Sequence, residues 1–288
     1  MIDRARRILP VATVLLALVA VWYPAAMWLN HETAANLADD GATGRDIWVS
    51  TLWLDRPVLP LPHQVTGEIL DGLFGFPVTS PHSLVFHAAV TAEAALCGFA
   101  IAVVLGTALA VGIVHARALD RSLMPWVIAS QTVPVLAIAP MVVVVLGNAG
   151  LTGMLPKALI AGWLSFFPVT IAMVTGLRAP DPMQRDLMRT YAASEAQVFT
   201  RLRWPASMAF LFPALKVASA LALVGAIVAE LPTGAQAGLG ARLLAGSYYG
   251  QTLQIWAALF TAAALALLAT GGVDLARACL VRAWGGRL

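Results

Sequence analysis

The sequence predicts an all-α membrane protein with six transmembrane helices and both termini in the cytoplasm. Three observations support this fold class. The chain of 288 residues is 60% hydrophobic and only 11% charged, whereas a soluble domain typically carries about 25% charged residues. The apolar residues occur in runs that are long enough to cross a bilayer as helices. The basic residues are concentrated in alternate connecting segments, as they are in cytoplasmic loops.

The first apolar run, residues 8–29, follows a basic start and ends among Trp and Tyr residues. It has about the length of a bilayer and exceeds the apolar core of a signal peptide, so we expect an uncleaved anchor helix. The other spans are expected at residues 84–114, 123–146, 156–177, 209–231 and 254–276. Prolines interrupt three of them, at Pro134, Pro140, Pro168 and Pro213. Each proline alone is more simply a kink, but several together favour a transport pathway.

Basic residues set the expected orientation. With the N-terminus inside, the inner segments carry thirteen of them: Arg4, Arg6, Arg7, Arg117, Arg121, Arg178, Arg185, Arg189, Arg201, Arg203, Arg277, Arg282 and Arg287. The outer segments carry four: Arg45, Arg56, Lys157 and Arg242. This bias places both termini in the cytoplasm. Lys216 falls inside the fifth span, where we expect its side chain to snorkel to the inner surface.

The chain is expected to have four parts. They are the anchor helix at 1–29, an outer acidic insert at 30–83, a core transmembrane domain at 84–276 that includes an inner loop at 179–207, and a tail at 277–288. The insert holds seven acidic residues and two arginines. Its stretch LPLPHQVTGEILDGLF predicts proline turns followed by a short helix with one apolar face, formed by Val65, Ile69, Leu70 and Leu73. This helix either caps the bundle at the interface or offers a landing surface to an outer partner.

The inner loop contains the polar passage YAASEAQVFTRLRWPAS. Ser194 is expected to cap a helix that starts at Glu195, with basic residues near its end that favour the helix dipole. Val198, Phe199 and Leu202 form an apolar edge, whose exposure would require a protein partner or the headgroup region. We expect Trp204-Pro205 to stop this helix at the membrane surface. A preceding short helix is expected after Asp181, with Pro182 in its first position.

This passage resembles the cytoplasmic loop EAA-x3-G-x9-I-x-L-P of the permease subunits of bacterial ABC importers. The chain reads D-L-M-R-T-Y-A-A-S-E-A-Q-V-F-T-R-L-R-W-P, so Asp186 stands for the family Glu and Ala192 for the Gly. Arg203-Trp204-Pro205 matches the end of the motif, while Leu187-Met188 replaces the two alanines. An alanine in a left-handed turn would cost about 1 kcal/mol, so a reshaped turn is expected.

Further stretches strengthen the resemblance, which covers residues 57–276 in order. PVLAIAPMVVVVLG, GWLSFFPVTIAMVTGLRAPDP, FPALKVASALALVGAIVAE and GAQAGLG are similar to the branch that handles taurine, alkanesulfonates, nitrate, riboflavin and thiamine-precursor pyrimidines. The resemblance implies a type I ABC importer permease fold, multi-pass in the bacterial inner membrane, with a periplasmic insert and a cytoplasmic coupling loop. It implies a permease that passes a small organic solute from a periplasmic binding protein to the cytoplasm.

The implied partners are two ABC ATPase subunits, a second permease copy or a sister permease, the binding protein and membrane lipid. The chain has no G-x-x-x-x-G-K-[ST] loop, so it cannot cradle phosphates. We therefore expect no cofactor and no enzymatic activity in this chain, with ATP and Mg bound by the ATPase. The sequence has no patch of aromatic and basic residues, so nucleic acid binding is not expected. The histidines lack ligand spacing and the two cysteines lie far apart, so neither a metal site nor a disulfide is expected.

The resemblance implies that residues 194–203 form the coupling helix, which docks in a groove of the ATPase. Val198 and Phe199 would be its anchors, with polar residues at the rim. The expected ATPase-coupling residues are Asp186, Arg189, Ala192, Ala193, Ser194, Glu195, Gln197, Val198, Phe199, Arg201 and Pro205.

Six residues are candidates for the translocation pathway: Glu93, Gln131, Thr132, Ser165, Phe166 and Glu230. A carboxylate at membrane depth faces a cavity or the bundle interior, so Glu93 is either a pathway residue or a buried structural partner. Glu230, near the outer interface, either caps backbone groups or contacts the solute. Gln131, Thr132, Ser165 and Phe166 lie beside proline breaks, where helix packing is the alternative to lining the pathway.

Several alternatives stay open at this point. A membrane enzyme would need a nucleophile, base or metal cluster, and none is evident in the sequence. An ion-coupled secondary transporter would use Glu93 and Glu230 as ion sites, and an inverted repeat would favour it. Within the importer, a thiamine-precursor pyrimidine or similar heterocycle is the best substrate prediction, with sulfonate, taurine or nitrate as alternatives. The sequence does not distinguish a homodimer from a heterodimer of permeases.

Overall fold

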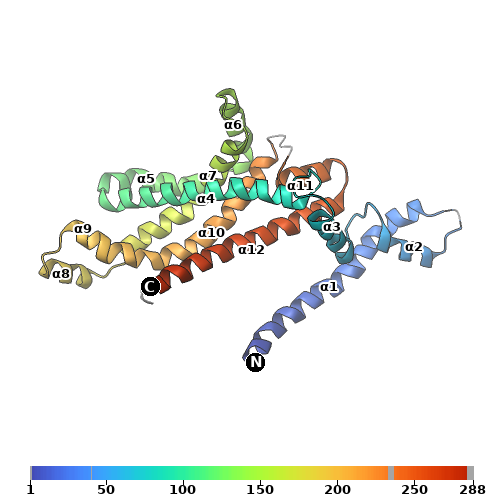
Figure 1. Ribbon diagram of the computed structural model, residues 1–288, viewed down its shortest axis with the longest axis horizontal. Coiled ribbons are helices and arrows are strands. Elements are labelled where there is room, and N and C mark those ends of the chain that lie inside the picture. Colours follow the sequence, from blue (N-terminus) through green and yellow to red (C-terminus); the bar gives the residue numbers. More distant parts are fainter. Residues whose placement is uncertain (1, 40, 233–236, 284–288) are drawn as a thin grey trace. The chain divides into compact units, whose positions relative to one another are not determined.

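The computed structural model describes residues 2–39, 41–232 and 237–283, which form helices and connecting turns without a strand (Figure 1). The predicted tail from residue 284 onward, with Arg287, lies outside the described residues, as do Met1 and Asp40. The elements are α1 (Ile2–Leu37), α2 (Gly44–Ser50), η1 (Thr51–Trp53), α3 (Pro62–Phe74), α4 (Leu84–His115), α5 (Arg117–Ala129), η2 (Ser130–Thr132), α6 (Val135–Asn148), α7 (Met154–Arg178), α8 (Pro182–Thr190), α9 (Glu195–Val198), η3 (Phe199–Arg203), α10 (Trp204–Glu230), α11 (Leu239–Tyr248) and α12 (Thr252–Ala283).

Five helical stretches are long and apolar enough to cross a membrane: α1, α4, α7, α9 to α10, and α12. The pair α5 and α6 passes the same test together, which gives up to six spans. The predicted all-α membrane fold is therefore confirmed. Of the predicted proline breaks, Pro140, Pro168 and Pro213 lie inside helices.

The third predicted span, residues 123–146, is sharply bent at one of its predicted proline breaks, Pro134. The chain bends by 103° between α5 and α6. Val133, which links η2 to α6, is extended at φ −78° and ψ 122°. A residue before proline is disfavoured in the helical region, and Pro134 has no N–H to continue the ladder. The break therefore follows from the Val133-Pro134 sequence.

The chain folds into two compact units, Met1–Phe86 with Arg242–Thr261, and His87–Ala241 with Ala262–Leu288. In the first unit the insert is fastened to α1. The buried Asn30 amide donates to the Leu59 carbonyl at 2.9 Å and accepts from the Leu59 N–H at 3.1 Å. The Trp22 indole donates to the Pro60 carbonyl at 3.0 Å. The predicted short helix is confirmed as α3, with Val65 buried and Leu70 exposed.

In the second unit α7 and α10 lie side by side and pack closely against each other (Figure 1). Small residues permit this approach. A Cβ added to Gly98 of α4 would lie 2.4 Å from the Cβ of Ala161, and one added to Gly225 of α10 would lie 2.7 Å from the Ala161 Cα. Two glycines thus enclose Ala161 of α7. Close packing of this kind holds helices together where lipid offers no hydrophobic drive.

The snorkelling predicted for Lys216 stays a prediction, and the structure gives this lysine a partner. Its ammonium group forms an ion pair with Asp274 of α12, so the lysine does not need to reach water alone. Because each charge at membrane depth is costly, the pair joins α10 to α12 and satisfies both groups.

Candidate functional site

The predicted inner loop forms two capped helices, α8 and α9. Asp181 accepts from the Met183 N–H at 3.2 Å, and Pro182 takes the first helical position, as predicted. Ser194 accepts from the Gln197 N–H at 3.3 Å, and the Gln197 side chain accepts from the Ser194 N–H at 2.8 Å. These reciprocal bonds satisfy N–H groups that have no partner inside the helix. The predicted helix start at Glu195 is confirmed.

The turn between α8 and α9 keeps a left-handed residue. Ala192 has φ +50°. Its N–H donates to the Arg189 carbonyl at 2.9 Å, and the Ala193 N–H donates to the Met188 carbonyl at 3.0 Å. Bonds of this pattern close the end of a helix around a left-handed residue. The expected reshaping of the turn is therefore not found, and Ala192 adopts the conformation that glycine favours.

The helix that begins at Glu195 does not stop at Trp204-Pro205, so that prediction is wrong. It passes through η3, which is π-helical, and continues as α10 to Glu230 (Figure 1). Pro205 cannot donate a hydrogen bond to the preceding turn. The wider π turn, in which the Trp204 N–H donates to the Phe199 carbonyl, accommodates this loss. The result is one continuous helix from Glu195 to Glu230, which we call the α9–α10 rod.

The apolar edge predicted for this helix faces the chain's own core. Val198 is only 7% exposed. The Phe199 ring lies 5.2 Å from the ring of His115 and 5.9 Å from that of Trp204, and it packs against the buried cluster of α4, α7 and α10. Leu202 is half-buried. Val198 is therefore not the exposed anchor that we expected, while Phe199 is half-buried against this chain.

Exposed apolar side chains lie on α8 instead. Met183 is 80% exposed, Leu187 56% and Tyr191 77%. Their spacing of four residues places them on one face of a helix, and we call them the α8 stripe. Sequence reasoning missed this surface because it concentrated on the passage after Tyr191. The spacing was present in the sequence and could have been found.

The polar residues around the stripe are open to a partner. Asp186 and Arg189 form an exposed ion pair at 3.0 Å, which contributes little to stability in water. Glu195, Gln197 and Arg201 are exposed as well. The side chains available for docking are thus an apolar stripe and a polar surround.

The predicted pathway residues lie in different local environments. Ser165 is fully buried, and its hydroxyl donates to the Ala161 carbonyl of its own helix at 2.6 Å. The half-buried Phe166 ring lies 5.7 Å from that of Trp163. Gln131 and Thr132 are exposed in η2. Ser165 therefore has the packing role that was its alternative.

The two carboxylates also differ from each other. Glu93 is exposed on α4, which excludes the role of a partner buried within this chain. Glu230 is fully buried and accepts hydrogen bonds from the Thr91 hydroxyl and the Gly240 N–H. Of its two predicted roles, the one that caps backbone groups is the one observed.

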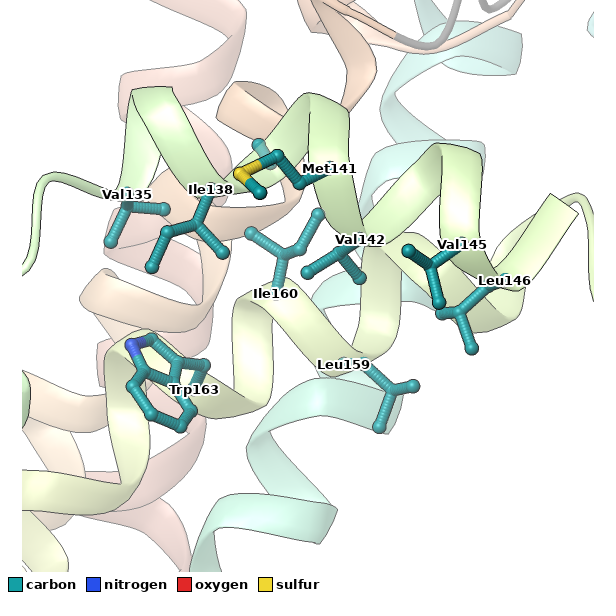
Figure 2. Close-up of a pocket in the computed structure, with 10 residues that line it drawn as sticks. Val135, Ile138, Met141, Val142, Val145, Leu146, Leu159, Ile160 and Trp163 are labelled. Atoms are coloured by element: carbon teal, nitrogen blue, oxygen red, sulfur yellow. The ribbon is translucent and has the colours of Figure 1, made fainter.

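A cavity of about 470 Å³ lies between α6 and α7. Figure 2 shows its lining, with side chains of α6 such as Val142 and Met141 above Ile160 and Trp163 of α7. The lining residues are Val135, Ile138, Ala139, Met141, Val142, Val145, Leu146, Leu159, Ile160 and Trp163. All are apolar apart from the indole N–H of Trp163. This wall lacks the several convergent polar groups that recognise a polar solute.

Comparison with known proteins identifies the kind of chain that carries these features. The family model "Binding-protein-dependent transport system inner membrane component" matches residues 102–284. A formylaminopyrimidine transport permease protein of Halalkalibacterium halodurans is 32% identical over 197 residues, 67% of this chain and 74% of that protein. A riboflavin transport system permease protein of Chloroflexus aurantiacus is 33% identical over 213 residues, covering 73% and 74%. A putative aliphatic sulfonates transport permease protein of Bacillus subtilis is 24% identical over 189 residues, covering 66% and 67%.

Proposed function

Because the chain belongs to the family of binding-protein-dependent transport system inner membrane components, we propose that its spans form the solute pathway of an ATP-driven importer. It is a multi-pass permease of the inner membrane. The observation that best supports the mechanism is the exposed α8 stripe beside one end of a rod that continues into the transmembrane bundle. Such an arrangement allows a partner outside the bilayer to move a helix inside it.

Both termini and the α8–α9 loop lie in the cytoplasm in this proposal. The excess of arginine in the segments that would then be internal supports this orientation. The insert of residues 30–83 and the α10–α11 connection then face the periplasm.

The α8 stripe docks in a groove of an ABC ATPase subunit. Covering Leu187, which is 56% exposed, removes apolar surface from water, and full burial of a leucine is worth about 1.5–3 kcal/mol. The surrounding Asp186, Arg189, Glu195, Gln197 and Arg201 form the polar rim of the contact. Ala192, Ala193 and Ser194 set the angle between the two short helices.

The ATPase subunits bind ATP and Mg and perform hydrolysis, while this chain changes conformation. Val198 and Phe199 transmit force rather than making the first contact, because Val198 is buried within this chain and Phe199 packs against its core. Pro205 lies in the first turn of α10, directly after the π-helical turn that joins the docked helix to the membrane segment. Closure of two ATPase subunits would then move α9–α10 as a rigid body.

The assembly contains a second permease, either another copy of this chain or a sister chain, and a periplasmic binding protein. The exposed Glu93 supports the presence of a second permease or a water-filled pathway beside α4, because an exposed carboxylate within a membrane span is costly against lipid. A second permease or a wet pathway would satisfy it. Gln131, Thr132 and Phe166 remain candidate pathway residues in the same arrangement.

The proposed substrate is a small nitrogen heterocycle such as a thiamine-precursor pyrimidine. Support comes from the formylaminopyrimidine and riboflavin permeases, each more than 30% identical to this chain. The chain's two lysines also lie beside carboxylates, Lys157 near Glu230 and Lys216 near Asp274. Neither lysine adds uncompensated positive charge for a sulfonate or nitrate. Uptake of labelled formylaminopyrimidine, riboflavin and taurine into proteoliposomes, each with its binding protein, distinguishes these solutes.

The docking proposal is tested with Leu187→Asp. The carboxylate would have to be desolvated in the groove, so we expect at least about a tenfold loss of ATPase co-purification. Ala283→Asp adds the same charge at the exposed end of α12 and serves as the matched control. Equal ATPase recovery with Leu187→Asp and with the unsubstituted chain would refute docking through α8. Uptake that continues under ATP depletion with an ion gradient would instead support a secondary transporter.

A further inference from the structure

The end of the α9–α10 rod that is distant from α8 holds a buried polar cluster. It consists of His87 and Thr91 of α4, Lys157 of α7 and Glu230 of α10, and we call it the Glu230 cluster. Every member is less than 9% exposed. Three helices of one compact unit therefore bring their polar side chains to a single point.

The Glu230 cluster binds three consecutive backbone N–H groups at the start of α11. The Gly238 N–H donates to Nδ1 of His87 at 3.0 Å, the Leu239 N–H to Oγ1 of Thr91 at 2.8 Å, and the Gly240 N–H to Oε2 of Glu230 at 2.7 Å. These groups have no partner inside α11 because they precede its first full turn. Side chains from other helices thus cap α11.

The Thr91 hydroxyl connects the two sides of this arrangement. It accepts from the α11 backbone and donates to the Glu230 carboxylate, at 2.9 Å to Oε1. One hydroxyl therefore links the last residue of the rod to the first residue of α11.

Glycine makes the contact possible. Gly238 has φ +126°, and a Cβ added there would lie 2.2 Å from Cδ of Glu230. A Cβ added to Gly240 would lie 2.8 Å from the Glu230 Cβ. The backbone at residues 238–240 can therefore lie directly on the carboxylate, as a side chain would not allow.

Stability alone does not account for a carboxylate here. Lys157 lies 3.8 Å from Glu230 and also donates to the Ala237 carbonyl at 3.3 Å. Replacing a buried ion pair by apolar residues of similar volume is often neutral or stabilising, because desolvation offsets the attraction. What apolar residues would not supply is a fixed set of directional bonds between α10 and α11.

We propose that Glu230 and Thr91 are positioning residues that make α11 follow the rod. This inference rests on the proposed function, in which an ATPase moves the α8–α9 end. A rod of 36 residues spans about 54 Å at 1.5 Å per residue. Displacement at the docked end reaches Glu230 without an intervening loop, and the bonds at residues 238–240 transfer it to α11. ATP use inside the cell thereby changes the periplasmic segment.

The test uses the complex of the full chain with its ATPase subunits, and it needs no solute. A nitroxide is attached to Tyr248→Cys, at the exposed C-terminal end of α11, after Cys97 and Cys279 are replaced by alanine. The label's spectrum is recorded with and without ATP and vanadate, and ATP hydrolysis is measured on the same samples.

Thr91→Val and Thr91→Ser form the matched pair. Valine keeps the shape and removes the hydroxyl, whereas serine keeps the hydroxyl. We expect Val to reduce the ATP-dependent spectral change at least about fivefold, as loss of a hydrogen bond worth about 1 kcal/mol implies, while ATP hydrolysis per complex stays within about twofold. Ser should retain the change. Glu230→Gln, which keeps one acceptor for the Gly240 N–H, should fall between them.

Three results with the Thr91 variants overturn the inference. Val could retain the full change, Val and Ser could lose it equally, or the change could fall only in proportion to the amount of assembled complex, as a purely structural role predicts. A complex that hydrolyses ATP without any response at residue 248 overturns the inference but leaves the proposed function intact. A chain that binds no ATPase overturns both.

Discussion

Replacing Ala192 by glycine should stabilise the turn between α8 and α9. Ala192 has φ +50°, and a left-handed conformation costs an L-residue about 1–2 kcal/mol. Glycine removes that cost but loses more freedom on ordering, worth about 0.5–1 kcal/mol. The net gain is therefore about 0.5–1 kcal/mol, because the other bonds of the turn involve backbone groups and are unchanged.

Hydrogen exchange of peptides spanning α8 and α9 measures this gain directly. The amides of Ala192 and Ala193 are bonded to carbonyls of α8, so they exchange when the turn opens. A gain of about 0.5–1 kcal/mol should slow their exchange about two- to fivefold. The amides of α7 should be unaffected.

Ala193→Gly provides the matched control. Ala193 has no positive φ, so glycine there adds freedom to the unfolded turn without relieving strain. We expect faster exchange in this variant. If Ala192→Gly also accelerates exchange, or if the two variants behave alike, the strain at Ala192 does not exist and the reasoning is refuted.

Two further predictions concern the transmembrane bundle. Gly98→Ala places a Cβ against α7, so the stability of the protein in detergent should fall by about 1–3 kcal/mol, as in other overpacked cores. Gly271→Ala, with open space around it, should be neutral or stabilising. Equal melting temperatures for the two variants would contradict the packing argument. Lys216→Met and Asp274→Asn should each lower the melting temperature more than the double substitution does. Each single change leaves one partner of the ion pair without the other. Additive effects of the two substitutions would show that the pair is not coupled.

The sequence predicts the helices well where composition decides them. Long apolar runs define α4, α7 and α12 because a helix satisfies its backbone groups within one segment in lipid. Local chemistry also predicts the caps at Asp181 and Ser194, since capping depends on residues within one turn. The predicted domain boundaries remain predictions, as does the orientation.

Packing limited the prediction of the docking surface. Val198 and Phe199 resemble an exposed edge in sequence because a helix pattern shows that residues share a face, not which neighbour covers it. Here Val198 is buried, and Phe199 packs against His115 and the core of the bundle. The continuity of the rod was missed for a related reason, because Pro205 normally ends a helix and only the π-helical turn reveals how it is accommodated.

The Glu230 cluster was beyond sequence reasoning. Thr91 and Glu230 hydrogen-bond across a separation of 139 residues, and nothing local pairs them. Glu93 had the stronger sequence signal, a carboxylate deep in a span, yet it lies on the exposed side of α4. Which of two carboxylates is buried depends on helix rotation, and the weak amphipathicity of such apolar helices does not determine it.

Site-specific photo-crosslinking in native membranes tests the central claim most directly. A benzophenone side chain at Leu187, on the α8 stripe, should form an adduct with the nucleotide-binding subunit, because this surface is the one proposed to enter its groove. The same probe at Phe199 should react within the chain. An adduct at position 199 and none at position 187 would contradict the account.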